Sequence, residues 1–304
     1  MTRAKHSRSH RRRTRRESLT ALAMLAPALV LFAVFVFYPL GRTVYLGLHR
    51  QSLFGAMRYV GWSQYTDVLK SADFHHSLFV TFVFALLTVP GGLAAGLGLA
   101  VLANKKLRGI TFYRTLFSST VATSVAVTSL IWLVLLNPSI GVLPKTFSGL
   151  EILQTPGLLG RSNTALLAVS ISTLWQNLGF TFILMTAGLQ SIPEDLYESA
   201  RVDGATPWRQ FSNITVPMLG PTLMFGFVVL TIGAFQSFGQ IDLLTQGGPG
   251  NSTRVIVYDI YQKAFGTSPN PGVAAAEAVL LFLIVVVLSI VQFRWLDKRV
   301  HYGS

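Results

Sequence analysis

The chain has 304 residues, of which 51% are apolar and only 12% are charged. Soluble globular domains carry roughly 25% charged residues, so water is not the main solvent of this protein. It contains no cysteine, which excludes disulfides, thiolate catalysis and cysteine-ligated metals. The six histidines form no spaced ligand motif, so no metal site is expected. The net charge of +13 could suit a nucleic acid, but eight Lys or Arg crowd between Arg3 and Arg16, as in the basic tails that flank membrane spans.

Long runs without Asp, Glu, Lys or Arg predict transmembrane helices, because a span needs about 20 apolar residues. Five runs are uninterrupted, and a sixth contains only Glu277, near one end. The sequence therefore predicts an all-α polytopic membrane protein, with a basic tail over residues 1–18 and a six-helix domain over 19–304. The predicted spans cover about 19–40, 77–103, 115–136, 164–188, 217–238 and 274–294.

The first apolar run could instead be a secretory signal, since Arg15 and Arg16 precede it. The run is about twice as long as a typical hydrophobic signal core, no small-residue cleavage site follows it promptly, and five further spans come after it. The run is therefore interpreted as the first span.

The basic residues of the loops predict the orientation. With the N-terminus inside, 17 of the 25 Lys and Arg fall on the cytoplasmic side: eight in the tail, four over 105–114, two over 201–209 and three over 294–299. Both termini are therefore expected in the cytoplasm.

This orientation makes residues 189–216 an internal loop, and its sequence predicts a helix, a turn and a second helix. Pro193 at a first helical position, followed by Glu194 and Asp195, suits the positive end of a helix dipole. Gly204 is expected to end this helix, and Thr206-Pro207 to begin the next.

The same loop contains Glu198-Ser199-Ala200, three residues, Gly204, nine residues, and Ile214-Thr215-Val216-Pro217. It resembles the EAA loop of ABC importer permeases at every spacing, with Ser199 and Val216 as conservative departures. The resemblance implies a type I importer transmembrane domain whose loop docks on an ATPase. The coupling residues that it implies are Glu198, Ala200, Asp203, Gly204, Phe211, Ile214 and Pro217.

A second motif resembles the last external loop of carbohydrate-type permeases, with Thr245, Gly247-Gly248-Pro249 and Ser252-Thr253. It is not a phosphate-binding loop, because no Gly-Lys-Ser/Thr follows it. The segment from Val279 to Val300 is similar to the A-type permeases of sn-glycerol-3-phosphate importers, which implies that solute or a glycerophosphodiester. Permeases for disaccharides share most of these features, so a disaccharide or oligosaccharide is the alternative.

The resemblance implies a bacterial plasma-membrane complex with a second homologous permease, a dimer of ABC ATPase subunits and an external solute-binding protein. The sequence has no G-x-x-x-x-G-K-S/T loop, so this chain is expected to be non-enzymatic, with ATP and Mg on the partner ATPase and no cofactor of its own. A secondary transporter is the alternative of another class. It is disfavoured because no inverted repeat is visible and the spans lack carboxylate and histidine relays.

Polar residues inside the spans are candidates for the solute path, since unpaired polar groups in hydrocarbon are costly. By similarity to the maltose permease, the positions are Asn177, Phe180, Gln236 and Ser237. The alternative is that they only bond neighbouring helices. For Glu277 the sequence leaves two interpretations: an ion pair with an external Arg such as Arg254, or a side chain that reaches the interface.

Overall fold

The computed structural model describes residues 21–51, 57–104 and 109–297. Within these residues the regular secondary structure is helical apart from one two-stranded antiparallel hairpin, in which Arg50 and Arg58 face each other. The basic tail expected over 1–18 lies outside the described residues. Four helices are long and apolar enough to cross a membrane, and they match the first, second, fourth and sixth predicted spans: Ala21–Gly47, α4 (Ala72–Ala103), α8 (Ala165–Gln190) and α15 (Pro271–Asp297).

The third and fifth predicted spans are pairs of helices that meet at a bend. The segment Ile110–Ala122 lies at 106° to α6 (Val125–Leu136), and Pro207–Met218 lies at 66° to α12 (Gly220–Phe235). At the first bend the backbone of Ser124 is extended, and its hydroxyl accepts a hydrogen bond from the Val127 amide and caps a new helix. Six spans result if each pair counts as one. The bend interrupts the third predicted span, whereas in the fifth it lies between Met218 and Gly220, at the start of the predicted range 217–238.

The shorter elements complete the chain between these helices. One π-helical turn lies within the first helix, and 3-10 and π turns adjoin the bends. Their bounds are η1 (Ala33–Phe37), α2 (Tyr38–Gly47), β1 (His49–Gln51), β2 (Met57–Tyr59), α3 (Ser63–Lys70), α5 (Ile110–Ser118), η2 (Ser119–Ala122), α7 (Val142–Thr146), η3 (Glu151–Leu153), α9 (Glu194–Val202), α10 (Pro207–Gln210), η4 (Phe211–Thr215), α11 (Val216–Met218), α13 (Gly239–Leu244) and α14 (Ile256–Phe265).

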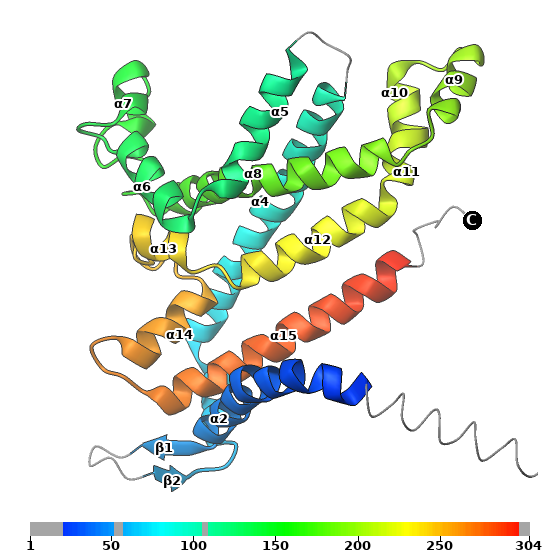
Figure 1. Cartoon of the computed structure of the whole chain (residues 1–304). Coiled ribbons are helices and arrows are strands. Elements are labelled where there is room, and N and C mark those ends of the chain that lie inside the picture. Colours follow the sequence, from blue (N-terminus) through cyan, green and yellow to red (C-terminus); the bar gives the residue numbers. More distant parts are fainter. Residues whose placement is uncertain (1–20, 52–56, 105–108, 298–304) are drawn as a thin grey trace, which may run out of the picture.

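Helix α8 is the centre of the fold and packs most extensively on α4 (Figure 1). Small residues bring its neighbours close, as is common between membrane helices. A Cβ added to Gly96 of α4 would lie 2.6 Å from the side chain of Thr181 of α8. A Cβ on Gly188 would lie 2.7 Å from Leu219, just before α12. These contacts fix α4, α8 and α12 against one another.

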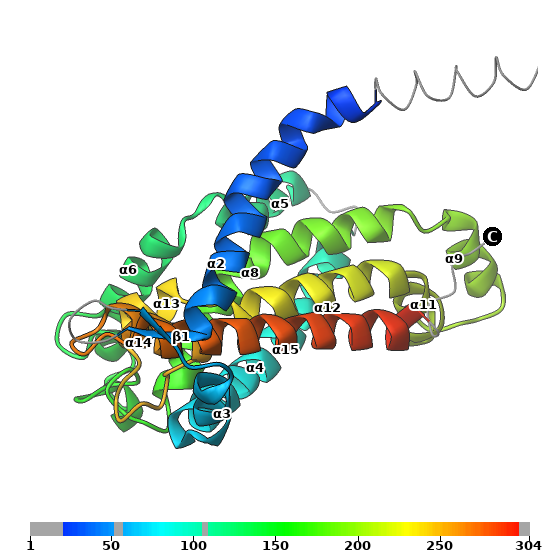
Figure 2. The same ribbon diagram turned by 90° about the horizontal axis from the view of Figure 1, so that it is seen from below.

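The two ends of this bundle carry different elements (Figures 1 and 2). The hairpin of α9 and α10 lies at one end, together with the C-terminal end of α15. The β-hairpin, α13 and α14 lie at the other. The sequence places these two groups in loops on opposite sides of the membrane, and the arrangement in space agrees.

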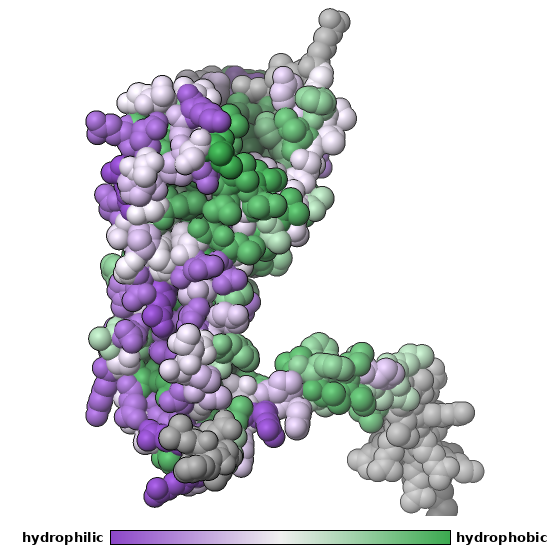
Figure 3. Space-filling view, turned by 90° about the vertical axis from the view of Figure 1, so that its left-hand side faces the viewer, coloured by the Kyte–Doolittle hydropathy of each residue, from purple (hydrophilic) through white to green (hydrophobic). Residues whose placement is uncertain are grey.

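The first helix leaves the body of the molecule (Figures 2 and 3). Every residue from Ala21 to Pro39 is exposed, although the segment is apolar. Only its end is buried, where Gly47 packs against Tyr65 and α15. An apolar helix without partners in its own chain is suited to lipid or to another subunit.

Candidate functional site

The loop between α8 and α12 folds as the sequence predicts around Gly204. Helix α9 ends in a Schellman arrangement: the Ala205 amide donates to the Ala200 carbonyl at 2.8 Å, and the Gly204 amide donates to the Arg201 carbonyl at 3.1 Å. Gly204 has φ +73°, a left-handed conformation that glycine adopts without strain. The sequence predicts Pro193 at the first helical position, whereas α9 begins at Glu194 and Pro193 lies one position before it.

The second helix of this loop also begins as the sequence predicts. Thr206 caps it through a hydrogen bond from the Arg209 amide to its hydroxyl at 3.4 Å. The helix continues through η4 and α11 to the bend before α12. A hydrogen bond of 3.0 Å between the Tyr197 and Thr215 hydroxyls ties the two helices of the loop together. The loop is therefore rigidly joined to a membrane helix.

The outer face of this loop combines apolar surface and charge. Trp208 is 74% exposed and stacks near Phe211, with ring centroids 5.6 Å apart. Val202 is 88% exposed. Glu198 is also exposed and makes no ion pair with any described residue. Exposed aromatic and aliphatic side chains beside an unpaired charge are typical of a protein docking surface.

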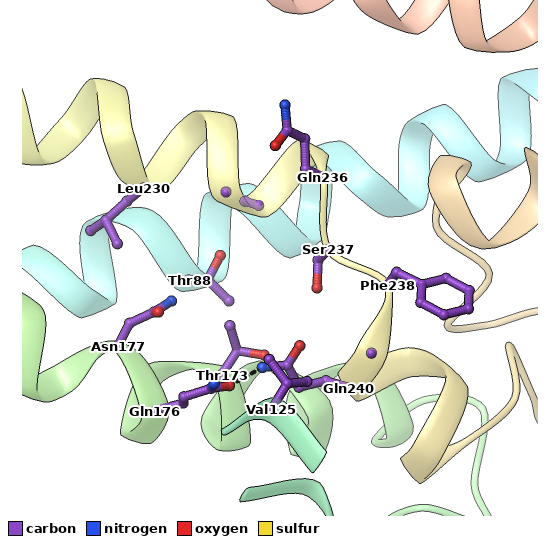
Figure 4. A pocket seen from close by; sticks show the side chains of 13 residues that line it. Thr88, Val125, Thr173, Gln176, Asn177, Leu230, Gln236, Ser237, Phe238 and Gln240 are labelled. Carbon is purple, nitrogen blue, oxygen red and sulfur yellow. Dashed lines mark hydrogen bonds between the residues drawn. The ribbon is translucent and has the colours of Figure 1, made fainter. Parts of the chain in front are cut away.

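A central cavity of about 290 Å³ lies between α4, α6, α8 and the end of α12 (Figure 4). It brings together three of the four residues expected on the solute path: Asn177, Gln236 and Ser237. Phe180 does not line it and packs against the apolar core. The sequence predicts Gln236 and Ser237 inside the fifth membrane helix, but α12 ends at Phe235 and both residues lie just beyond it.

The cavity also contains polar residues that the sequence analysis did not single out: Thr88, Thr173, Gln176 and Gln240. The Gln240 amide donates to the Gln176 carbonyl oxygen across the cavity wall. The Ser237 hydroxyl oxygen is buried and has no hydrogen-bond partner among the described residues. None of the lining residues is charged, so the wall offers amides and hydroxyls, which suit a polyol. Gln176 directly precedes Asn177 in the same apolar run, so its position in the sequence could have identified it as a candidate for the solute path.

Aromatic rings of Phe238 and α14 adjoin this cavity. Phe238 lines the cavity and contacts two tyrosines of α14, with its centroid 4.9 Å from Tyr261 and 6.0 Å from Tyr258. The Gly247-Gly248-Pro249 motif lies behind them. Gly247 has φ +79°, and a Cβ there would lie 2.8 Å from the Tyr258 ring. Buried Thr253 donates to the Gly248 carbonyl at 2.9 Å and holds the turn.

Four charged residues form a cluster at the base of α14. Lys263 Nζ lies 2.6 Å from Asp259 Oδ2 and 2.7 Å from Glu277 Oε2, while Arg254 Nη2 lies 2.5 Å from Asp259 Oδ1. Both carboxylates are fully buried. Glu277 therefore neither reaches the interface nor pairs with Arg254; its partner is Lys263. Each buried carboxyl group thus has a basic side chain within ion-pair distance, as buried acids require.

The protonation of the two α14 residues follows from this pairing. Burial by itself would raise the pKa of Asp259, but hydrogen bonding and the charges of Lys263 and Arg254 bring that pKa below its usual value. Burial would lower the pKa of Lys263, but its hydrogen bonds to the two carboxylates raise that pKa above its usual value. Asp259 and Lys263 therefore both stay charged at neutral pH.

The chain belongs to the family described as binding-protein-dependent transport system inner membrane component, which it matches over residues 89–302. It is 37% identical to the sn-glycerol-3-phosphate transport system permease protein UgpA of Agrobacterium fabrum, over 92% of this chain and 95% of that protein. It is 38% identical to the protein of that name from Rhizobium meliloti, with the same coverage. The identity to the one from Yersinia pestis is 31%, over 92% of this chain and 94% of the relative.

The fold is similar to that of a bacterial ABC transporter involved in the import of the acidic polysaccharide alginate, with a TM-score of 0.80 and 22% identity. The alignment covers 93% of this chain and 96% of the transporter chain. A second structure, of an alginate ABC transporter in complex with its pentasaccharide-bound periplasmic protein, gives a TM-score of 0.81 at 21% identity, over 95% and 98% of the two chains. The predicted all-α, polytopic importer fold is confirmed.

Proposed function

We propose that this chain is one permease subunit of an ABC importer for sn-glycerol 3-phosphate or a glycerophosphodiester. The observation that carries the proposal is the coupling loop: a rigid helical hairpin, joined to a membrane helix, that presents Glu198 and Trp208 outward. The solute is that named for relatives 31–38% identical along nearly the whole chain.

In this proposal a second homologous permease completes the path, a dimer of ATPase subunits binds the coupling loops, and an external binding protein delivers the solute. ATP and Mg belong to the ATPase. Both termini face the cytoplasm, because the basic residues concentrate there. The loop transmits closure of the ATPase dimer to α12, to which it is joined through α10, η4 and α11.

The test is uptake of labelled glycerol 3-phosphate by proteoliposomes that contain the complete complex, with loaded binding protein and ATP. Uptake should need ATP and should be inhibited by glycerophosphodiesters but not by disaccharides. Uptake of a disaccharide without competition by glycerol phosphates would assign the importer to sugars.

The coupling role has its own test. Glu198→Lys reverses an exposed charge, so insertion should be normal, while docking against a complementary ATPase surface should lose several kcal/mol. We expect the ATPase to dissociate or to lose its stimulation by loaded binding protein. Glu151→Lys, the same reversal on an exposed residue of η3, outside the coupling loop, is the control. Wild-type stimulation and ATPase retention in Glu198→Lys would refute the role.

A further inference from the structure

A second polar hollow lies between α5 and α8, which pack side by side. It measures about 360 Å³ and is open on one side. It lies toward the coupling-loop end, since it includes Gln190, the last residue of α8. We call it the inner groove, and its lining is Thr111, Arg114, Thr115, Ser118, Phe182, Ile183, Thr186, Ala187 and Gln190.

The inner groove continues the face of α8 that lines the central cavity. Residues 173, 176 and 177 line the cavity, and 183, 186, 187 and 190 line the groove. With Phe180 between them, residues 173, 176, 183, 187 and 190 follow one another at steps of three or four and form one stripe along the helix, while Phe182 lines the groove from another side of α8. The α5 side has the same spacing, with 111, 114, 115 and 118. Phe180 falls on the α8 stripe between the two hollows.

Among the described residues that line the groove, Arg114 is the only charged one. Its Nε and Nη2 donate to the Ala103 carbonyl, at the end of α4, at 3.1 and 2.8 Å. A guanidinium has five N–H donors, so three remain. Within the described ranges no carboxylate lies within ion-pair distance of Arg114. The backbone contact thus holds the guanidinium in place while its charge stays uncompensated.

The central cavity offers no such group, and the hollow that shares Gln190 with the groove holds Arg201 together with the acidic residue Glu194. The lining of the central cavity is uncharged, and Arg254 and Lys263, near its outer end, are committed to buried carboxylates. A phosphate group needs a cation and several donors, which an Arg beside hydroxyls supplies. Thr111, Thr115, Ser118 and Thr186 line the same groove. The hydroxyls of Thr115, Ser118 and Thr186 donate to backbone carbonyls of their own helices, so the donors at hand are the Thr111 hydroxyl and the three remaining N–H groups of Arg114.

We propose that the inner groove is a phosphate-binding site, occupied by the phosphate of the solute as it leaves toward the coupling-loop end. The assignment to the solute rests on the proposed function. A phospholipid headgroup has the same chemistry, and the test separates the two sources.

The chain has no cysteine, so a single Thr115→Cys reports on the groove alone. Its labelling by a charged maleimide would be measured in the complete complex in nanodiscs without nucleotide, with inorganic phosphate, glycerol 3-phosphate or glycerol as the probe. Asn104→Cys, exposed at the end of α4 and outside the groove, is the control. The lipid would be phosphatidylcholine alone or mixed with phosphatidylglycerol.

We expect both phosphates to slow labelling of Thr115→Cys by about threefold at twice their Kd, as mass action gives, and glycerol to have no effect. Asn104→Cys should not respond. Adding Arg114→Gln should abolish the protection, while Arg114→Lys, which keeps the charge, should retain most of it. Co-purification of all subunits with each variant would show an intact complex.

No slowing by phosphate, or equal slowing with Arg114→Gln, would overturn the site. Slowing by phosphatidylglycerol but not by the soluble phosphates would overturn the assignment to the solute. Uptake of glycerol 3-phosphate without protection would overturn this inference alone. Protection by inorganic phosphate without uptake of glycerol 3-phosphate would keep the site and overturn the proposed solute.

Discussion

Removal of Lys263 is expected to be among the most destabilising single changes at the outer end of this protein. Lys263→Met leaves Glu277, which is fully buried, without its ion-pair partner, and leaves Asp259 with Arg254 alone. Breaking a buried pair from one side costs about 3–5 kcal/mol, because a desolvated charge stays behind. Glu277→Gln should cost less, about 1–3 kcal/mol, since Lys263 keeps Asp259 and the amide oxygen can still accept a hydrogen bond.

The double variant gives the sharper test. With Lys263→Met and Glu277→Gln combined, no unpaired carboxylate remains, so the double variant should be more stable than Lys263→Met alone. The coupling would be about 1–3 kcal/mol. The assay is thermal unfolding of the purified permease pair in one detergent, with insertion checked by expression. Additive losses, or a Lys263→Met variant as stable as wild type, would refute the account of the cluster.

The same cluster predicts a pH dependence. Because the pKa of Asp259 is lowered in the folded state, its contribution to stability is full above its unfolded pKa of about 3.9 and is lost as pH falls through the lower folded value. The pKa of Lys263 is raised, so its contribution is full below its unfolded value and is lost only as pH rises through the folded one. Asp259 and Lys263 should therefore both contribute their full stabilisation from about pH 5 to 9. Asp259→Asn should remove the acid-dependent step from an unfolding series measured against pH, and an unchanged step would contradict it.

Three further outcomes are expected. Gly204→Val meets no neighbouring atom, so it should cost only the strain of φ +73°, about 1–3 kcal/mol at the turn, and should abolish ATPase stimulation without affecting insertion. Gly96→Ala should destabilise the protein by about 1–2 kcal/mol, because its new Cβ would lie 2.9 Å from the Thr181 backbone, and this overpacking outweighs a gain of about 1 kcal/mol in helix propensity. Gly98→Ala has open space around it, so this control should be neutral or stabilising in the same unfolding assay. A cysteine at exposed Ser268, between α14 and α15, should react with an impermeant maleimide from outside only, and labelling only from inside would refute the predicted topology.

The features that the sequence predicts well are those that depend on neighbours along the chain. Apolar runs identify membrane helices because hydrocarbon requires a continuous stretch of about 20 residues. The turn at Gly204 is equally local, since a left-handed residue and its Schellman hydrogen bonds involve only adjacent positions. The family motif in this loop therefore indicated both its conformation and its exposed Glu198.

The features that only the tertiary structure decided depend on contacts between distant segments. The bends before α6 and α12 leave the apolar runs uninterrupted, so hydropathy does not reveal them. The central cavity gathers Thr88, Gln176 and Gln236 from three segments, and no local pattern connects those positions. Glu277 takes Lys263 and not Arg254 as its partner because α14 folds back on α15. A charge in a sequence shows that a partner is needed, and only the packing of the helices selects which one.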